Sequence, residues 1–345
     1  MQTLTDLPFS FLDQLLAYSG FREIFCLRKV CRGLRDYIDT TKPDLKLTQL
    51  FITLREEKLY LTLQFRDEQV VVEYRNGYGS NLFDFHCLVS DGEVVKTLKG
   101  ERCMDLFFGD FRLVLNLQKT KLKSLKLSQE TKYNEILFEE QTSRNLFERL
   151  EECFKARSCR LQTTEINLQT FSILQVLSIL PYLEPKTLKN IKLMLPTVPY
   201  NKETGSRTWR TEKLEELEQW QMAESLNISK DICIGFIINF LHFTHVCVTF
   251  YSISGRDLLT IKNILLDDDR VHEFFFKYKH LYHGEQFFES LGRPYIEEQN
   301  PRNLWYFRFP ESEQILRVCH WSASLMMSFH RKDVESVPVN AVIQE

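Results

Sequence analysis

The chain has 345 residues, of which 43% are hydrophobic and 26% are charged, as in globular proteins with a substantial buried core. Its formal net charge is -3, so no overall positive field attracts nucleic acid or an anionic membrane, and either partner would need a local basic patch. The length is sufficient for one large domain with a small one, or for two to three domains.

The cysteines and the longest apolar run bear on the compartment. Nine cysteines occur without a CxxC pair, at Cys26, Cys31, Cys87, Cys103, Cys153, Cys159, Cys233, Cys247 and Cys319. An odd number without a pairing pattern fits free, buried thiols in a reducing compartment. Residues 1–6 are polar and unlike a secretory signal peptide. The run 232–243 has about a dozen residues, whereas a bilayer span needs roughly 20. These features predict a buried element there, and a soluble protein of the cytoplasm or nucleus.

The first 45 residues predict three short amphipathic helices. Leu7-Pro8 is typical of a helix start, and the apolar residues that follow recur at helical spacing: Phe11, Leu12, Leu15 and Leu16. Gly20 interrupts this pattern before a second helix begins. In the stretch LRKVCRGLRDYI (27–38), one apolar stripe with i, i+3, i+4, i+7, i+11 spacing is formed by Leu27, Val30, Cys31, Leu34 and Ile38.

The charged residues of this segment lie off the apolar stripe. Six basic residues (Arg22, Arg28, Lys29, Arg32, Arg35, Lys42) balance six acidic ones (Asp6, Asp13, Glu23, Asp36, Asp39, Asp44), which leaves residues 1–45 with no net charge. A neutral segment is a poor phosphate binder, so the arginines are interpreted as a solvated polar face. Three short helices cannot bury this many apolar residues among themselves, which predicts that the segment packs against another surface.

Residues 4–42 resemble an F-box. The resemblance is carried by Leu7-Pro8, by the pairs Phe11-Leu12 and Leu15-Leu16, and by residues 27–32, which match the family pattern Leu-x-x-Val-Cys-Arg. Ser19 and Leu34 stand where the family more often has Leu and an aromatic residue. The resemblance implies docking on a Skp-type adaptor, and through it on a cullin–RING ubiquitin ligase, by helices laid into an apolar groove. The implied contacts are Pro8, Leu12, Leu15, Leu16, Val30, Cys31 and Leu34, with the internal F-box core as the alternative role for each.

Residues 46–120 are interpreted as a strand-rich region that follows a linker at 40–44. Period-two alternation or β-branched residues predict antiparallel strands at 47–54, 58–65, 69–74, 84–89, 103–108 and 111–117. RNGYGSN (75–81) is predicted to be a turn. Its Gly-x-Gly lacks the third glycine and the following helix of a phosphate-binding loop.

Residues 121–335 alternate helix and strand. Strands are predicted at 122–128, 160–168, 188–195, 245–253 and 272–278, and helices at 143–156, 172–183 and 256–266. The stretches 174–195 and 258–279 both run from an apolar helix through a polar loop to an alternating strand. This repetition predicts a solenoid-like α/β stack with a parallel sheet, related in style to leucine-rich repeats. An exposed loop and charged helix (197–220) interrupt it, and three closing strands (303–309, 315–321, 323–332) precede a frayed end (335–345).

Three stretches of this region resemble the C-terminal homology domain, called FTH, of a nematode-expanded F-box family. They are LSILPYLEPKTLKNIKL (177–193), LLTIKNILLDDDRVHEFFFKY (258–278) and WYFRFPESEQILRV (305–318). The resemblance covers about residues 130–322 and implies a domain that recognises a partner or substrate, with no known cofactor. The fold class expected for the whole chain is therefore α+β / α/β: an F-box (1–45), antiparallel strands (46–120) and leucine-rich-repeat-like units (121–335).

Motifs for catalysis or metal binding are missing from the sequence. His242-x-x-His245 and His280-x-x-His283 lack the third and fourth ligands that zinc needs. The acidic run 267–269 lacks the spacing of a calcium loop. No Walker loop, G-x-S-x-G or zincin motif occurs. We therefore expect no catalysis and no cofactor.

A target surface is predicted on the strand 272–278. Alternation places Phe274, Phe276 and Tyr278 on one face, which is expected to be core. The opposite face and two further tryptophans give the predicted target-binding residues: Phe275, Lys277, Lys279, Trp209 and Trp305.

These observations predict a non-catalytic substrate-receptor subunit of an SCF-type (Skp–cullin–F-box) E3 ubiquitin ligase. It would raise ubiquitin transfer by holding a target near the charged E2. One alternative is a non-degradative interaction scaffold that uses the F-box or the FTH-like surface, which the departures at Ser19 and Leu34 favour. The other, a hydrolase or nucleic-acid binder, has neither a motif nor a basic field behind it.

Overall fold

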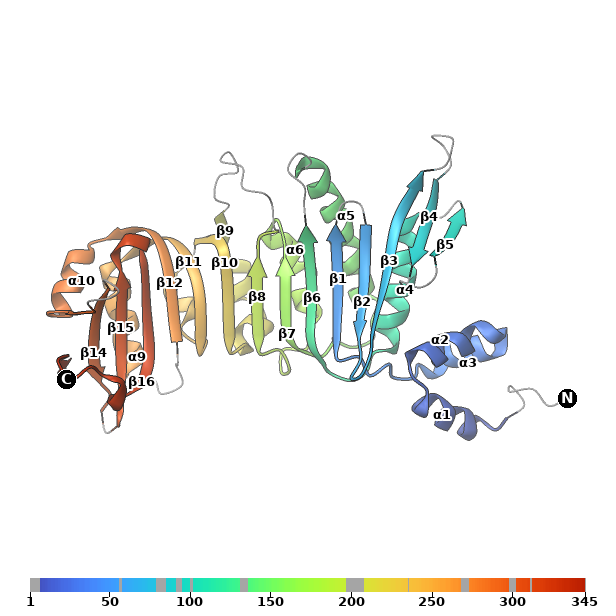
Figure 1. Cartoon of the computed structure of the whole chain (residues 1–345), viewed down its shortest axis with the longest axis horizontal. Helices are drawn as coiled ribbons and strands as arrows, with labels where there is room; N and C mark the ends of the chain where they lie inside the picture. The colour runs from blue at the N-terminus through green and yellow to red at the C-terminus, as the bar shows by residue number, and fades with distance from the viewer. Residues whose placement is uncertain are drawn as a thin grey trace. The chain divides into compact units, whose positions relative to one another are not determined.

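The structure is a computed structural model, and it describes residues 7–55, 58–78, 85–90, 95–99, 102–130, 136–196, 208–234, 236–267, 273–297, 302–310 and 312–344. The chain divides into two compact units. Unit 1 comprises Met1–Thr164 and Ser178–Thr187, and unit 2 comprises Glu165–Leu177 and Leu188–Glu345. The expected mixed α/β class with three N-terminal helices is confirmed (Figure 1).

Unit 1 combines helices with a mixed sheet. Its helices are α1 (Phe9–Tyr18), α2 (Phe21–Val30), α3 (Arg32–Thr41), α4 (Cys103–Leu117), α5 (Ile136–Lys155) and the 3-10 helix η2 (Leu180–Tyr182). Its strands are β1 (Gln49–Arg55), β2 (Lys58–Gln64), β3 (Gln69–Tyr78), β4 (Phe85–Ser90), β5 (Val95–Lys99), β6 (Leu122–Glu130) and the start of β7 (Thr163–Gln169). The bonding order is β6-β1-β2-β3-β4-β5, antiparallel except for the parallel pair β6–β1. Five predicted strands (47–54, 58–65, 69–74, 84–89, 122–128) and the helix 143–156 are confirmed.

The core of unit 1 lies between this sheet and α4, which Figure 1 shows behind β3 and β4. Alternate residues of β1 and β2 are buried, so one face of the strands meets the helices. Phe107 of α4 packs edge-to-face on Tyr74 of β3, with ring centroids 5.5 Å apart, and also contacts Phe108 and Phe111. Aromatic side chains bury large apolar areas, so this cluster is a major source of stability for unit 1.

Helix α4 corrects the predicted strands 103–108 and 111–117. The buried residues of α4 include Phe107, Phe111 and Val114, which follow the i, i+4, i+7 spacing of one helical face. Apolar residues are so dense in this segment that period two fits it almost as well as period 3.6. The turn predicted at 75–81 is also wrong where the chain is described, because Asn76 of β3 pairs with Cys87 of β4; residues 79–81 lie outside the described ranges.

Two of the cysteines that were expected to be free are joined. Cys87 of β4 and Cys103, the first residue of α4, form a disulfide across 16 residues of sequence. The other seven cysteines are not disulfide-bonded, and three of these are buried: Cys153, Cys233 and Cys319. The expectation of buried free thiols is therefore right for those three, wrong for the joined pair, and wrong in burial for Cys26, Cys31 and Cys159, which are exposed.

Unit 2 contains a larger sheet. Its helices are α6 (Ile173–Leu177), α7 (Glu212–Glu215), α8 (Glu218–Met222), α9 (Gly255–Asp267), α10 (Gly284–Ser290) and the 3-10 helices η3 (Ile237–Phe240), η4 (Ser322–Ser324) and η5 (Val334–Ser336). After the rest of β7, its strands are β8 (Asn190–Met194), β9 (Thr208–Arg210), β10 (Ser225–Ile234), β11 (His245–Ser254), β12 (Glu273–Tyr282), β13 (Tyr295–Ile296), β14 (Asn303–Arg308), β15 (Gln314–Trp321), β16 (Met326–Asp333) and β17 (Ile343–Gln344).

The sheet of unit 2 has a parallel and an antiparallel part. Strands β7, β8, β10, β11 and β12 are parallel neighbours, as the helix–strand alternation predicted. Strands β16, β15, β14 and β13 continue the sheet antiparallel and confirm the predicted closing strands. The connections are irregular: α9 has 13 residues between β11 and β12, whereas η3 has 4 between β10 and β11. Likeness to leucine-rich repeats in detail therefore stays a prediction.

Three further expectations for unit 2 need correction. The predicted helix 172–183 is represented by the short α6 and η2. Of the segment 197–220, the part from 208 forms β9, α7 and α8 instead of one charged helix, and 197–207 lies outside the described ranges. The run 232–243 is not uniformly buried, because Phe236 is 78% exposed and Ile238 59% exposed.

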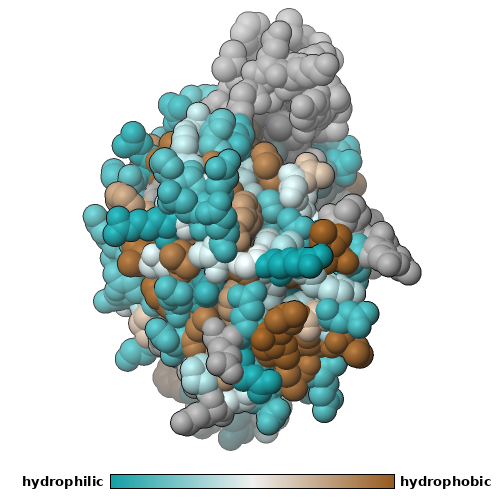
Figure 2. Space-filling view, turned by 90° about the vertical axis from the view of Figure 1, so that its left-hand side faces the viewer, coloured by the Kyte–Doolittle hydropathy of each residue, from teal (hydrophilic) through white to brown (hydrophobic). Residues whose placement is uncertain are grey.

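The C-terminal segment is ordered against the sheet and is not frayed as predicted. The backbone N–H of Val334 donates to the Glu313 carbonyl at 2.9 Å, and Ile343 of β17 pairs with Tyr306 of β14. Val339 and Val342 of the same segment are exposed. Figure 2, which views the side on which β14 and α10 lie, shows hydrophobic areas among a mostly hydrophilic surface.

Candidate functional site

Helix α1 begins and ends where local hydrogen bonds satisfy its backbone. Pro8 precedes the first turn, and its carbonyl accepts from the N–H of Phe11 at 2.9 Å. At the other end the Ser19 hydroxyl donates to the Leu15 carbonyl at 2.7 Å. The backbone N–H of Ser19 donates to the same carbonyl at 2.9 Å, so Ser19 closes the last turn of α1 with two hydrogen bonds to Leu15.

The stretch 27–38 is two helices and not one. Helix α2 ends at Val30, and Cys31 has an extended backbone with φ -156° and ψ 166°. The Cys31 Sγ then accepts from the N–H of Leu34 at 3.5 Å, so Cys31 is the N-cap of α3. The predicted single apolar stripe is therefore wrong, because Leu34 and Ile38 are buried on α3 while Val30 and Cys31 are exposed.

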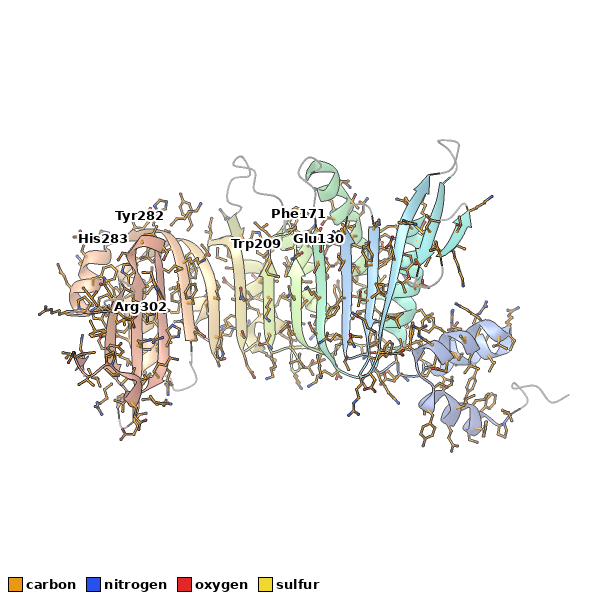
Figure 3. All side chains as sticks on the ribbon, in the orientation of Figure 1. Glu130, Phe171, Trp209, Tyr282, His283 and Arg302 are labelled. Carbon is orange, nitrogen blue, oxygen red and sulfur yellow. A yellow bond between two sulfur atoms is a disulfide. The ribbon has the colours of Figure 1, made fainter. Side chains whose placement is uncertain are left out.

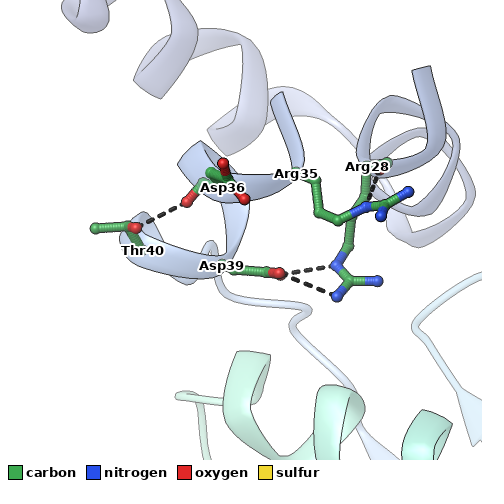
Figure 4. Close-up of polar contacts among 5 residues, drawn as sticks. All are labelled: Arg28, Arg35, Asp36, Asp39 and Thr40. Carbon is green, nitrogen blue, oxygen red and sulfur yellow. Dashed lines mark hydrogen bonds and ion pairs between the residues drawn. The ribbon is translucent and has the colours of Figure 1, made fainter. Parts of the chain in front are cut away.

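The basic residues of this stretch hold α2 against α3 (Figure 4). Arg28 donates two hydrogen bonds to the Asp39 carboxylate, from Nε at 2.7 Å and from Nη2 at 3.0 Å. The bond to Asp39 raises the pKa of Arg28. Arg35 Nε donates to the Arg28 carbonyl at 3.2 Å. The interpretation of the arginines as a merely solvated face is therefore wrong for Arg28, whose forked pair with Asp39 is half-buried.

We expect the Arg28–Asp39 pair to contribute a coupling energy of about 0.5–1 kcal/mol, because its geometry is bidentate but both side chains remain partly in water. A double-mutant cycle with Arg28→Met and Asp39→Asn, followed by urea unfolding in far-UV circular dichroism, measures it. The control cycle uses Arg32→Met and Asp36→Asn, whose side chains are 92% and 66% exposed. A coupling as small as that of the control would contradict the prediction.

The seven predicted adaptor contacts divide by burial. Three of them are buried inside the helical bundle: Leu12, Leu16 and Leu34. Leu15 is half-buried, and Pro8, Val30 and Cys31 are exposed. The exposed positions remain free to contact a partner, whereas the three buried leucines together with Ile24 form the core that positions them.

Two further apolar side chains of α1 are exposed, in addition to the predicted adaptor contacts. Phe11 is 51% exposed and Tyr18 is 92% exposed. With Leu15 they occupy positions i, i+4 and i+7 and so share one face of α1, which we call the α1 face. The sequence reading missed Tyr18, although its spacing from Phe11 was the available signal. Exposed apolar groups that cluster in this way mark interaction surfaces.

Of the predicted target-binding residues, some are buried and others are exposed. Trp209 of β9, labelled in Figure 3, and Trp305 of β14 are both buried, which corrects the expectation that they are exposed. Trp305 Nε1 donates to the Gly292 carbonyl at 2.9 Å, so its polar edge is occupied. Lys277 and Lys279 of β12 are exposed and Phe275 is half-buried, as strand alternation predicted.

Phe275 belongs to an open face of the unit 2 sheet, opposite the buried residues of the same strands. Lys192, Asn227, Cys247 and Phe275 lie in register across β8, β10, β11 and β12. The Phe275 ring lies 6.2 Å from that of Trp321, which the sequence reading did not select. This face therefore combines polar, cationic and aromatic groups, a composition suited to binding a protein surface.

His330 of β16 adds a half-buried titratable group to this sheet. Its Nε2 lies 2.7 Å from the Ser328 hydroxyl, and its Nδ1 lies 3.4 Å from Glu273. Burial, followed by the positive charge of Arg317, lowers the pKa of His330 from the usual 6.5 to about 4, against the opposing effect of Glu273. His330 is therefore neutral in the folded protein at neutral pH.

We expect unit 2 to lose stability as the pH falls from about 6.5 towards 4. The folded-state pKa of His330 lies below its unfolded-state value, so the unfolded chain binds more protons in this window and stability rises with pH. Urea unfolding followed by tryptophan fluorescence at pH 7 and pH 5 should show the loss, and His330→Gln should reduce it. The exposed His280→Gln serves as control, and an unchanged pH dependence in His330→Gln would contradict the prediction.

The described residues contain neither a metal-binding cluster nor a helix that could span a membrane. Within the described ranges no group of three or more His, Cys, Asp and Glu side chains could hold a metal ion. In the same part of the chain, no helix combines the length and hydrophobicity that a membrane crossing requires. The ring of His242 bonds the Trp220 carbonyl at 2.9 Å, so it has a structural partner.

The fold and these surfaces define the class: an α/β protein with an N-terminal three-helix module that leaves apolar side chains exposed. A family model, the FTH domain, matches residues 144–289. F-box A protein 224 of Caenorhabditis elegans is 23% identical over 324 residues, which cover 91% of this chain and 76% of that protein. No solved structure matches the chain. These two matches support the predicted resemblance to the nematode F-box proteins with an FTH domain.

Proposed function

We propose that the chain is a substrate-receptor subunit of an SCF-type E3 ubiquitin ligase, and that it docks on a Skp-type adaptor through its N-terminal helices. The observation that carries this proposal is the exposure of Tyr18 on the α1 face and of Val30 at the end of α2. Neither side chain belongs to the buried core of the three helices. Apolar side chains left in water by a small bundle favour burial against a groove of a partner. The name of the related F-box protein supports the same partner.

The proposed role is non-catalytic and operates by proximity. The receptor holds a target so that its lysines remain close to the charged E2, which raises the effective concentration of the two reacting groups. The open face of unit 2, with Phe275, Lys277 and Lys279, is the proposed contact for the target. The ubiquitin chemistry belongs to the partners, and the proposed compartment is the cytoplasm or nucleus.

The two departures from the common F-box pattern do not by themselves favour a scaffold without ligase function. Ser19 closes α1 through its bond to Leu15, and Leu34 fills the bundle core at 3% exposure. Both residues therefore have structural roles that are compatible with docking.

Co-expression of the full chain with a Skp-type adaptor and a cullin tests the proposal. Gel filtration should yield a stoichiometric ternary complex, and chain-dependent ubiquitination of co-purified proteins should follow when E1, E2 and RING subunit are added. A chain that elutes alone while its circular dichroism shows a folded protein would overturn adaptor docking. A binary complex that never recruits the cullin would favour the non-degradative scaffold.

A further inference from the structure

Unit 1 contains a partly open cavity of about 400 Å³ that the proposed function does not use. It lies between α2, the strands β2 to β5 and α4. Figure 1 shows α4 behind β3 and β4, with α2 near the lower ends of these strands. The volume falls within the roughly 300–1,000 Å³ of small-molecule pockets.

The floor of the cavity is apolar because of the strand register. Leu61 pairs with Val72, and Leu63 pairs with Val70, across β2 and β3. These residues are two apart along each strand, so all four present their side chains to the same face of the sheet. All four line the cavity, and α4 adds Leu113 and Val114 on the opposite side.

At one end of the floor, a row of paired residues that crosses β3, β4 and β5 contains polar side chains. Tyr74 of β3 pairs with Val89 of β4, which pairs with Lys96 of β5. The Tyr74 hydroxyl donates to Asp110 Oδ2 of α4 at 2.6 Å, and burial together with this carboxylate raises the pKa of Tyr74. The carboxylate is thereby satisfied by a hydrogen bond from a neutral donor, and Lys96 reaches the same wall.

Four basic side chains line the cavity against the single acid Asp110. Two of them have partners elsewhere: Arg28 is bound by Asp39, and Arg22 lies 3.7 Å from Glu68. The other two, Lys29 of α2 and Lys96, have no ion pair within the described structure. An apolar floor with two uncompensated ammonium groups is complementary to an apolar chain that ends in one anion.

We propose that this cavity binds a free long-chain carboxylate, with its hydrocarbon chain between the sheet and α4 and its carboxylate at Lys29 and Lys96. A cavity of this size accommodates a chain of about a dozen carbons. Because α2 forms one wall and the sheet another, the bound chain would join these two parts of unit 1. The proposal goes beyond the ligase role and does not rest on it, since its tests use the full chain without an adaptor.

A cysteine in the lining of the cavity allows ligand binding to be followed by its rate of alkylation. Cys26 of α2 lines the cavity and is exposed, whereas Cys31 is exposed but lies outside the lining. Dodecanoate should slow the alkylation of Cys26 by iodoacetamide about fivefold or more at saturation and leave Cys31 unchanged, with each thiol followed by peptide mass spectrometry. Equal slowing of both thiols, or of neither, would overturn the proposal.

The head group is tested by a series with a constant chain length. Dodecanoate, dodecanol and dodecyltrimethylammonium are titrated into the full chain in a calorimeter, below their aggregation concentrations. The expected order of affinity is carboxylate, then alcohol, then ammonium, with about tenfold between the carboxylate and the alcohol. Equal affinities, or binding that does not saturate near one site per chain, would show adsorption only and overturn the proposal.

Matched variants locate the site. Val72→Trp fills the cavity and should abolish the binding of dodecanoate, whereas Val71→Trp places the same ring on the opposite face of β3 and should leave it intact. Lys29→Met with Lys96→Met should weaken dodecanoate binding about tenfold and dodecanol binding less than twofold. Lys99→Met, on the other face of β5, should change neither affinity. Loss of binding in Val71→Trp or Lys99→Met to the same extent would overturn the assignment.

Discussion

Phe107→Ala is expected to lower the free energy of unfolding of unit 1 by about 3–5 kcal/mol. The ring has no exposed surface and contacts three other aromatic rings, of Tyr74, Phe108 and Phe111. Truncation removes the transfer free energy of the ring and leaves a cavity, since the sheet and α4 can close only part of the gap. A loss of this size is a large fraction of the stability of a typical domain.

The positions of the tryptophans allow the two units to be followed separately. All four lie in unit 2, at Trp209, Trp220, Trp305 and Trp321. Tryptophan fluorescence therefore reports unit 2, whereas far-UV circular dichroism reports both units. Phe107→Ala should shift an early part of the dichroism transition to lower urea and move the fluorescence midpoint less.

A control substitution separates burial from residue type in this prediction. Phe11 is 51% exposed. Phe11→Ala should therefore change the free energy of unfolding by less than about 1 kcal/mol. If Phe107→Ala lowered the free energy of unfolding as little as Phe11→Ala does, α4 would not pack on the sheet as described.

Periodic signals predicted the elements whose apolar residues fit one period only. The parallel strands β8, β11 and β12 each alternate over at least five residues and lie next to helical or loop segments of a different pattern. Their order in the sheet followed from the helix–strand sequence, because such connections bring successive strands side by side in parallel. The same reasoning failed for α4, where apolar residues are too dense for either period to exclude the other.

The break between α2 and α3 was not predictable from spacing. Leu27, Val30, Leu34 and Ile38 continue a helical pattern through Cys31, and neither Gly nor Pro stands at the boundary itself. The extended backbone of Cys31 turns the chain, so that Leu34 and Ile38 on α3 are the buried residues of the predicted stripe. Sequence periodicity reports which residues are apolar at helical spacing, and tertiary packing decides where the helix stops.

The burial of the tryptophans shows a second limit of prediction from sequence, which is that local composition does not determine burial. A Trp between a polar and a charged residue, as Trp209 is between Thr208 and Arg210, has a local composition typical of a surface strand. Its burial depends on β10, with which β9 pairs through Trp209 and Cys233. The cavity of unit 1 is limited in the same way, because its walls come from three segments whose approach no local pattern encodes.

Val30→Asp is expected to weaken the binding of a Skp-type adaptor by about two orders of magnitude, or about 3 kcal/mol. Docking would bury Val30 in an apolar groove, where an unpaired carboxylate has to lose its hydration without compensation. In the free chain Val30 is 67% exposed, so the same substitution should change the stability by less than about 0.5 kcal/mol. The expected result is thus a folded chain that no longer co-purifies with the adaptor.

Leu34→Asp provides the contrast that separates docking from folding. Leu34 is 3% exposed in the bundle core, so a carboxylate there should unfold the N-terminal helices and abolish binding indirectly. Amide hydrogen exchange distinguishes the two variants: protection in α1 and α3 should persist in Val30→Asp and disappear in Leu34→Asp. Thr40→Asp, an exposed position on α3, should retain both binding and protection. If Val30→Asp binds the adaptor within twofold of the unmodified chain, docking does not use the end of α2, and the α1 face alone would have to carry it.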